Sequence, residues 1–274
     1  DVLGPDSLAP FHNDPLVLAV TMALIVMGGL GYVVWQDIDN KITFGRKKGL
    51  SLSQIIRRFS EHTKLVLTLT GVLIAAGTVF IFAVEFRNPQ TLGEMPLPQK
   101  ILNSLFESVT LRTAGFATFS QAGLTDVSCL AAYLLMFIGG SPIGTAGGVK
   151  TVTFAVLLAY SLSMVRGREE VSLWGRGIPR PALSKAVAVT GVSFATLFVC
   201  AVLLAAVTDA PVPDILYEAV SATATVGLSR DLTPTLGLWG KLVVIVTMYL
   251  GRVGPISLAV AFHARRKNHN SIKN

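Results

Sequence analysis

The protein has 274 residues, of which 51% are hydrophobic and 14% are charged, with a formal net charge of +7. Soluble domains usually contain about 25% charged residues, so this composition excludes an ordinary soluble globular protein and indicates that lipid covers much of the surface. The positive charge does not indicate nucleic acid binding, because the basic residues are concentrated between long apolar stretches.

Five apolar stretches are long enough to cross a hydrocarbon core, which needs about 20 residues. In chain order they cover residues 16–35, 65–86, 127–165, 182–207 and 236–262. The segments 36–64, 163–185 and 264–274 are basic, whereas the other connections are acidic. Basic segments mark the cytoplasmic side, so we expect a multi-pass membrane protein with a cytoplasmic C-terminus.

One layout occurs twice, with an offset of 112 residues between Gly115 and Gly227. Each copy starts at a proline-rich segment, continues as a semi-polar stretch of about ten residues, and ends in a Thr-x-Gly turn between two apolar spans. The copies read Glu107-Ser-Val-Thr-Leu-Arg-Thr-Ala-Gly-Phe116 and Glu218-Ala-Val-Ser-Ala-Thr-Ala-Thr-Val-Gly-Leu228. Each predicts a short re-entrant helix that reaches the middle of the bilayer and closes with a glycine turn. The repeats run in the same direction, so they can surround an axis along the membrane normal.

The two glycine turns have the chemistry of a cation filter. A cation entering a membrane must exchange water for other oxygen ligands, and backbone carbonyls provide them without a full charge. Glycine lets successive carbonyls point in one direction, and the C-terminal end of each short helix is the negative end of its dipole. The predicted ion-binding residues are Thr113, Ala114, Gly115 and Phe116 in the first turn and Thr225, Val226, Gly227 and Leu228 in the second.

The stretch 127–165 is too long for one transmembrane helix. Its 39 residues would form a helix of about 58 Å, against a hydrocarbon core of about 30 Å. Residues 139–148 contain five glycines and a proline, which are unfavourable inside helices, so we predict a non-helical glycine-rich loop there. A phosphate-binding loop is rejected, because Val149 separates the glycines from Lys150 and no strand precedes them. Lys150 is expected to extend toward the basic face, and Arg252 to point inward.

Four motifs carry a resemblance to a known family: Thr110-Leu-Arg-Thr-Ala-Gly-Phe116, Ile138-Gly-Gly-Ser-Pro-Ile-Gly-Thr-Ala-Gly-Gly-Val-Lys150, Ala224-Thr-Val-Gly-Leu228 and Leu250-Gly-Arg-Val-Gly-Pro255. Together they resemble the Trk/Ktr/HKT superfamily of potassium transporters, and most closely the KtrB-type membrane subunits of bacterial Ktr systems. The resemblance implies an all-α membrane protein whose tandem span–pore helix–filter turn–span repeats have pseudo-fourfold symmetry around a central pore. This chain matches the third and fourth repeats and the final helix of the second.

The resemblance also implies a function and partners. It implies K⁺ uptake across the bacterial cytoplasmic membrane, with Na⁺ as a possible second ion, no enzyme activity and no organic cofactor in this chain. The implied partners are the N-terminal half of the same protein, a homodimer partner, and a cytosolic regulatory ring of nucleotide-binding subunits. The implied gate consists of Gly139, Gly140, Ser141, Pro142, Gly144, Thr145, Ala146, Gly147, Gly148 and Arg252.

The resulting organisation has six segments. They are a final transmembrane helix of an upstream repeat (1–35), a basic cytoplasmic linker (36–61), the third pore repeat (62–165), a cytoplasmic linker (166–181), the fourth pore repeat (182–264) and a basic cytoplasmic tail (265–274).

Several assignments stay open at this stage. Glu107, Arg112 and Glu218 flank the turns, either as an ion pair that supports the filter or as a solvated vestibule rim. The segment 37–64 is an amphipathic helix on the inner leaflet, a dock for a cytosolic partner or a plain linker. Cys129 and Cys200 are expected to be small buried hydrophobic residues.

Four functions are candidates on the sequence. A K⁺-conducting transporter or channel fits the repeated turns. An alternating-access secondary transporter would favour inverted repeats and acidic residues near mid-membrane, whereas these repeats are direct. A Na⁺-selective member of the same superfamily remains an alternative, and a membrane scaffold or enzyme would not require repeated glycine turns.

Overall fold

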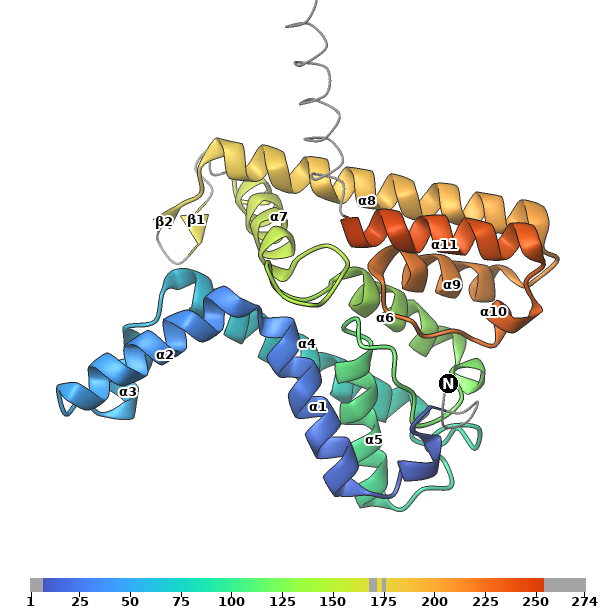
Figure 1. Ribbon diagram of the computed structural model, residues 1–274, viewed down its shortest axis with the longest axis horizontal. Coiled ribbons are helices and arrows are strands. Elements are labelled where there is room, and N and C mark those ends of the chain that lie inside the picture. Colours follow the sequence, from blue (N-terminus) through green and yellow to red (C-terminus); the bar gives the residue numbers. More distant parts are fainter. Residues whose placement is uncertain (1–6, 168–171, 174–175, 254–274) are drawn as a thin grey trace, which may run out of the picture.

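The computed structural model describes residues 7–167, 172–173 and 176–253, and these residues lie almost entirely in helices and their connections (Figure 1). β1 (Ser172–Leu173) and β2 (Arg176–Gly177) are the only strands among them, and they pair antiparallel within the expected linker 166–181. The expected all-α fold is therefore confirmed.

The first expected span is a bent pair of helices. After the short 3-10 helix η1 (Ala9–Phe11), α1 (Pro15–Leu30) is followed by α2 (Tyr32–Lys47), and the two meet at an angle of 95°. Gly31 separates them with φ 83° and ψ 151°, a conformation that only glycine adopts without strain. The apolar span expected over 16–35 is therefore interrupted at Gly31, and the apolar pattern alone does not show this change of direction.

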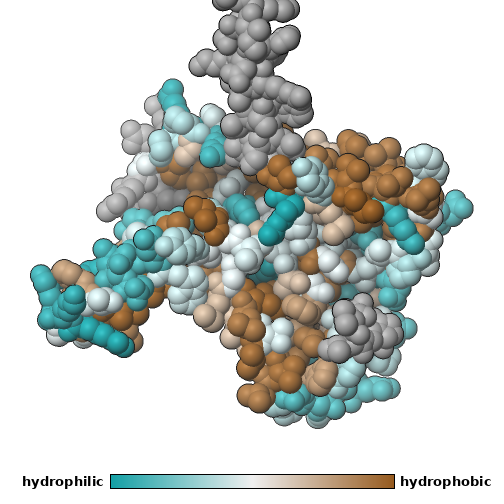
Figure 2. Space-filling model, in the orientation of Figure 1, coloured by the Kyte–Doolittle hydropathy of each residue, from teal (hydrophilic) through white to brown (hydrophobic). Residues whose placement is uncertain are grey.

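The basic segment after the bend forms a short helical hairpin. α2 is followed by α3 (Leu52–Arg57) and then by the long helix α4 (Glu61–Glu85). Asp37 Oδ2 accepts hydrogen bonds from the Ser60 N–H at 2.8 Å and the Thr63 hydroxyl at 2.7 Å, so α2 is tied to the start of α4. α2 and α3 extend away from the other helices in Figure 1, and their surface is mostly hydrophilic in Figure 2.

The segment expected to be the third repeat has the predicted order of elements. α4 is followed by the short helix α5 (Leu97–Thr110), the first glycine turn, the 3-10 helix η2 (Gln121–Gly123), α6 (Asp126–Phe137) and α7 (Thr151–Val165). α5 starts after Pro96, as the proline-rich segment indicated. The predicted break within 127–165 is confirmed, since the helices stop at Phe137 and resume at Thr151.

The segment expected to be the fourth repeat has the same order without the break. It comprises α8 (Arg180–Val207), α9 (Val212–Ala224), the second glycine turn, the short α10 (Leu232–Thr235) and α11 (Leu238–Val253). α6 and α11 begin 112 positions apart, which is the offset seen in the sequence. The rest of the last expected span and the tail 265–274 lie outside the described residues.

The two segments pack through a shared core and leave apolar outer faces. Tyr217 and Val220 of α9 are buried together with Met136 of α6 and Ile81 of α4. Within the described part of the chain, α4 and α8 are each long and apolar enough to cross a membrane, as is the bent pair α1–α2 if it is one span. Hydrophobic residues cover α1 with α5 and α8 with α11 in Figure 2. Phe194, for example, is 60% exposed on α8, as expected for a lipid-facing side chain.

Candidate ion-conducting site

The first glycine turn follows directly after α5. Thr113 has φ 70° and Gly115 has φ 83°. A β-branched residue at positive φ is an outlier, and such strain of about 1–3 kcal/mol concentrates at functional sites. The Thr110 hydroxyl closes the turn, because it donates to the Phe116 carbonyl at 2.6 Å and accepts from the Phe116 N–H at 2.9 Å.

The second glycine turn, at the end of α9, also has positive φ at its threonine and its glycine. Thr225 has φ 53° and Gly227 has φ 96°. Ser221 closes this turn, since its hydroxyl accepts from the Gly227 N–H at 3.1 Å and its carbonyl accepts from the Val226 N–H at 2.8 Å. Both turns are thus strained at a threonine and held by a hydroxyl of the preceding helix.

The two turns meet each other. A Cβ atom added to Gly115 would overlap the Val226 carbonyl oxygen and would lie 3.3 Å from the Gly227 Cα. Within the described residues, no donor is hydrogen-bonded to the carbonyl oxygens of 113–115 or 225–228. The hydroxyls of Thr113 and Thr225 are also buried without a protein partner in that part of the chain. The site therefore gathers oxygen atoms that the described protein leaves unused.

Glu107 and Glu218 are anchored behind the turns. Both are buried, and so is Arg112, which excludes the solvated rim. Glu107 Oε2 accepts from the Gln121 amide at 3.2 Å, and Glu218 accepts from two hydroxyls of the segment after the second turn. Among the described residues, neither glutamate forms an ion pair with Arg112, which instead donates to the Gly139 carbonyl at 3.4 Å.

The glycine-rich loop, residues 139–148, lies against both turns. Arg112 connects the first turn to Gly139. A Cβ atom added to Gly147 would overlap the Ala224 carbonyl oxygen and the Thr225 hydroxyl, so the loop backbone is packed against the end of α9. No side chain larger than hydrogen fits at this contact without movement of the loop or the turn.

The loop also donates hydrogen bonds to backbone carbonyls at the C-terminal end of α1. The 95° bend leaves carbonyls at the C-terminal end of this helix without intrahelical donors. The Ser141 N–H donates to the Gly29 carbonyl at 2.9 Å, and the Thr145 N–H donates to the Gly28 carbonyl at 3.2 Å. In return the Tyr32 N–H, at the start of α2, donates to the Ile143 carbonyl at 3.3 Å. The bend and the loop therefore stabilise each other.

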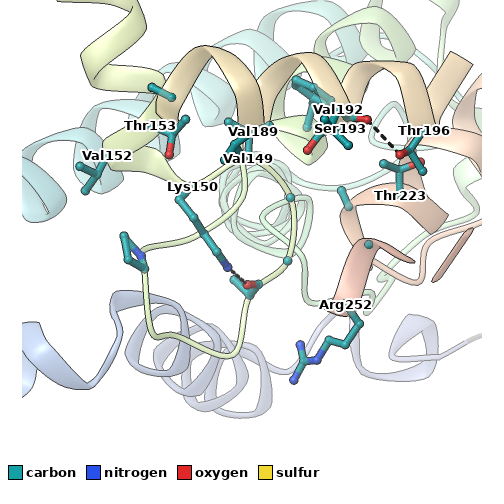
Figure 3. A pocket seen from close by; sticks show the side chains of 18 of the residues that line it. Val149, Lys150, Val152, Thr153, Val189, Val192, Ser193, Thr196, Thr223 and Arg252 are labelled. Atoms are coloured by element: carbon teal, nitrogen blue, oxygen red, sulfur yellow. Dashed lines mark hydrogen bonds between the residues drawn. The ribbon is translucent and has the colours of Figure 1, made fainter. Parts of the chain in front are cut away.

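Two cationic side chains hold adjacent carbonyls of this loop. Lys150 Nζ donates to the Ala146 carbonyl at 2.5 Å, and Arg252 Nη1 donates to the Thr145 carbonyl at 2.6 Å. Figure 3 shows Lys150 extending from the start of α7 toward the loop. The Lys150 ammonium group is therefore hydrogen-bonded within the loop, an interaction that the sequence did not predict.

A cavity of about 790 Å³ adjoins the loop. Helices α7, α8 and α11 form its walls, with apolar residues such as Val189 and Val192 on α8 (Figure 3). Thr223, Lys150 and Arg252 also line it, so it extends from the loop cations to the C-terminal end of α9. Irregular backbone at membrane depth needs such a protein-lined space.

A profile for cation transport proteins, named TrkH, matches residues 2–273. The chain belongs to the TrkH family of cation transport proteins. Its curated relatives include "Ktr system potassium uptake protein B" of Bacillus subtilis, 36% identical over 95% of this chain and 56% of the relative. "Potassium/sodium uptake protein NtpJ" of Enterococcus hirae is also 36% identical, over 93% of this chain and 54% of the relative. This TrkH-family chain thus spans about half the length of the curated relatives it matches.

Solved structures agree with this TrkH-family fold. The potassium transporter TrkH from Vibrio parahaemolyticus superposes with a TM-score of 0.70 over 94% of this chain and 54% of that protein, at 14% identity. The agreement supports tandem membrane repeats, consistent with a pseudo-fourfold arrangement, and the family is one of cation transport proteins rather than enzymes.

Sequence reasoning missed the residues that hold the turns in this TrkH-family chain. Thr110 and Ser221 each lie three positions after the repeated glutamate, and Gln121 and Thr233 are 112 positions apart. This regular spacing of hydroxyl and amide side chains was the signal that could have revealed them. The two cysteines, in contrast, are buried as expected and free.

Proposed function

We propose that this chain forms part of a K⁺ uptake protein, in which the two glycine turns supply ligands to a selectivity filter. The observation that supports this most is the meeting of Gly115 and Gly227, together with the unused carbonyl oxygens around them. The Phe116 carbonyl already accepts from Thr110. The first turn therefore offers mainly the carbonyls of 113–115.

The electrostatics of the turns favour a monovalent cation. α5 and α9 both end at the turns, so the negative ends of two helix dipoles point at the site. Arg112 lies next to the first turn, but its guanidinium donates to the Gly139 carbonyl of the glycine-rich loop. Carbonyl ligands without full charges bind a cation and still allow it to leave.

The glycine-rich loop acts as the gate in this proposal. It packs against the second turn through Gly147, and its carbonyls at 145 and 146 are occupied by Arg252 and Lys150. Two positive charges at this point repel a cation that leaves the filter. Opening requires the loop to move away from these contacts, so removal of the arginine raises the resting flux.

The remaining parts of the pore are assigned to the rest of a longer protein. A filter ring needs ligands from more than two turns, and the curated relatives are nearly twice as long as this chain. We therefore assign two further repeats to an N-terminal half, in a homodimer on a cytosolic nucleotide-binding ring. The complex lies in the bacterial cytoplasmic membrane with the C-terminus in the cytoplasm.

Na⁺ transport is the second candidate function, because one relative is named a potassium/sodium uptake protein. Both candidates use the same turns. They differ in the ion that the complete ring binds, which competition between the two ions measures directly.

The test uses the full-length protein, expressed in a K⁺-uptake-deficient bacterial strain and purified into liposomes. Growth at low K⁺ and rubidium uptake, each with Na⁺ as competitor, are measured for the wild type, Gly227→Ser and Arg252→Ala. We expect growth rescue by the wild type, weaker discrimination between K⁺ and Na⁺ in Gly227→Ser, and higher resting flux in Arg252→Ala. Gly191→Ala is the control, because a Cβ at this α8 position meets nothing within 4 Å.

Each part of the proposal can fail separately. Unchanged discrimination in Gly227→Ser refutes the filter assignment, and unchanged resting flux in Arg252→Ala refutes the gate assignment. Uptake that depends strictly on a counter-ion gradient refutes the pore in favour of alternating access.

A further inference from the structure

Gln121 connects the two short helices that end at the glycine turns. It lies in η2, after the first turn, and is only 4% exposed. Its amide nitrogen donates to Glu107 Oε2 of α5 at 3.2 Å, and its amide oxygen accepts from the Tyr217 hydroxyl of α9 at 2.7 Å. Glu107 and Tyr217 are completely buried, so water does not compete for either hydrogen bond.

The equivalent residue of the fourth repeat makes no such connection. Thr233 lies 112 positions after Gln121, and its hydroxyl donates to Glu218 and contacts Ser229 of the same repeat. Both repeats thus anchor their glutamate to the segment after the turn. An amide has a donor and an acceptor at separate atoms, and this allows Gln121 to hold its own glutamate and the neighbouring helix together.

We propose that Gln121 is a positioning residue for cation discrimination, because it fixes the separation of the two glycine turns through Glu107 and Tyr217. This inference rests on the filter role of the turns proposed above. Glu107 is eight positions before Gly115, and Tyr217 is ten positions before Gly227. A displacement between α5 and α9 is therefore passed to the turns through about one helical turn of α5 and about two helical turns of α9.

The separation of the turns matters because they are already in contact. The Val226 carbonyl occupies the place where a side chain of Gly115 would lie, so a small displacement changes the distance between the opposing ligand oxygens. Discrimination between K⁺ and Na⁺ depends on the size of the site or on the number and field strength of its carbonyls. Loss of the hydrogen bonds of Gln121 changes the size of the ion site and the placement of its carbonyls. The hydrogen bonds within each glycine turn stay in place.

Tyr133 provides a matched control for Tyr217. Its ring packs edge-on against the Tyr217 ring, with centroids 5.9 Å apart. Its hydroxyl donates to the Pro213 carbonyl at the start of α9 at 2.7 Å, and not to Gln121. Tyr133→Phe therefore removes one phenolic hydroxyl from the same cluster without touching the connection.

The experiment measures inhibition of rubidium uptake by K⁺ and by Na⁺ in liposomes that contain the full-length protein. The variants are Tyr217→Phe, Gln121→Met, the double variant and Tyr133→Phe, normalised to the amount of protein in the membrane. A buried hydrogen bond corresponds to a change of about three- to tenfold in an equilibrium ratio. In Tyr217→Phe and in Gln121→Met, we expect the inhibition by Na⁺, relative to the inhibition by K⁺, to increase by about three- to tenfold over the wild type. The double variant should show the same increase as each single variant.

The outcomes separate this inference from the proposed filter. If Tyr217→Phe leaves the inhibition ratio at the wild-type value while Gly227→Ser changes it, the role of Gln121 is refuted and the filter stands. An equal change in Tyr133→Phe also refutes it, because general loosening of the cluster then explains the result. If Gly227→Ser has no effect either, the filter proposal itself fails.

Discussion

Alanine at the two filter glycines separates backbone strain from steric overlap. Gly115 and Gly227 have φ 83° and 96°, so both substitutions place an L residue in the left-handed half of the φ range. A Cβ atom at Gly115 also overlaps the Val226 carbonyl, whereas a Cβ at Gly227 meets only the Gly115 Cα at 3.7 Å. The structure therefore predicts that the two variants are unequal.

The expected difference follows from adding the two effects. Positive φ costs an alanine about 1–2 kcal/mol, and overpacking in a tight site costs about 1–3 kcal/mol more. Gly227→Ala has only the first cost, and Gly115→Ala has both, for a total of about 2–5 kcal/mol. Since about 1.4 kcal/mol corresponds to a factor of ten, we expect uptake to fall roughly tenfold in Gly227→Ala and by about thirtyfold to several thousandfold in Gly115→Ala.

Rubidium uptake by the full-length variants in liposomes measures this difference, with thermal unfolding in detergent as a measure of overall stability. Gly191→Ala, where the added Cβ has open space, is the control for the glycine-to-alanine change itself. Equal losses at the two filter positions, or a larger loss in Gly227→Ala, would show that the turns do not meet at Gly115 as described.

Three further variants test the surrounding contacts. Thr110→Val leaves polar groups at the end of the first turn unpaired, so it should lower stability by about 1–3 kcal/mol in thermal unfolding and weaken ion discrimination; a neutral result contradicts its closing role. Gly31→Ala introduces positive-φ strain and an overlap with the loop backbone, so resting rubidium flux should rise, and unchanged flux contradicts the link between bend and loop. Burial alone would raise the pKa of Asp37, but hydrogen bonds from Thr63 and Ser60 outweigh it and leave that pKa below its usual value. The ionised carboxylate therefore stabilises the fold above the unfolded-state pKa of about 4, and this stabilisation is lost as the pH falls through the lower folded-state pKa. Thermal unfolding of Asp37→Asn should therefore not show the loss of stability that the wild type shows between about pH 5 and about pH 3. If the variant and the wild type lose stability equally over this range, the stabilising role of the Asp37 carboxylate is refuted.

The repeated layout and the loop could be predicted from the sequence because glycine and proline determine them locally. The 112-residue offset reappears in the first residues of α6 and α11. The break after Phe137 follows from a stretch too long and too rich in glycine for one helix. These features depend on the backbone preferences of a few residues and on the thickness of a bilayer.

The contacts between distant segments could not be predicted in the same way. The bend at Gly31 lies in an apolar run, and its backbone partners are more than 100 positions away in the loop. Glu107 and Arg112 have opposite charges and are near in sequence, but Arg112 follows the end of α5 and reaches Gly139 instead. Gln121 meets Tyr217 only because the two repeats pack together, and no local pattern contains that information.

Anomalous diffraction from crystals of the full-length protein soaked with rubidium tests most directly whether the two glycine turns share one ion. We expect an anomalous peak bounded by the backbone carbonyls of 113–115 and 225–227, with Gly115 and Gly227 facing the same ion. Rubidium bound elsewhere in the membrane region, with either glycine turn packed against lipid, would contradict it.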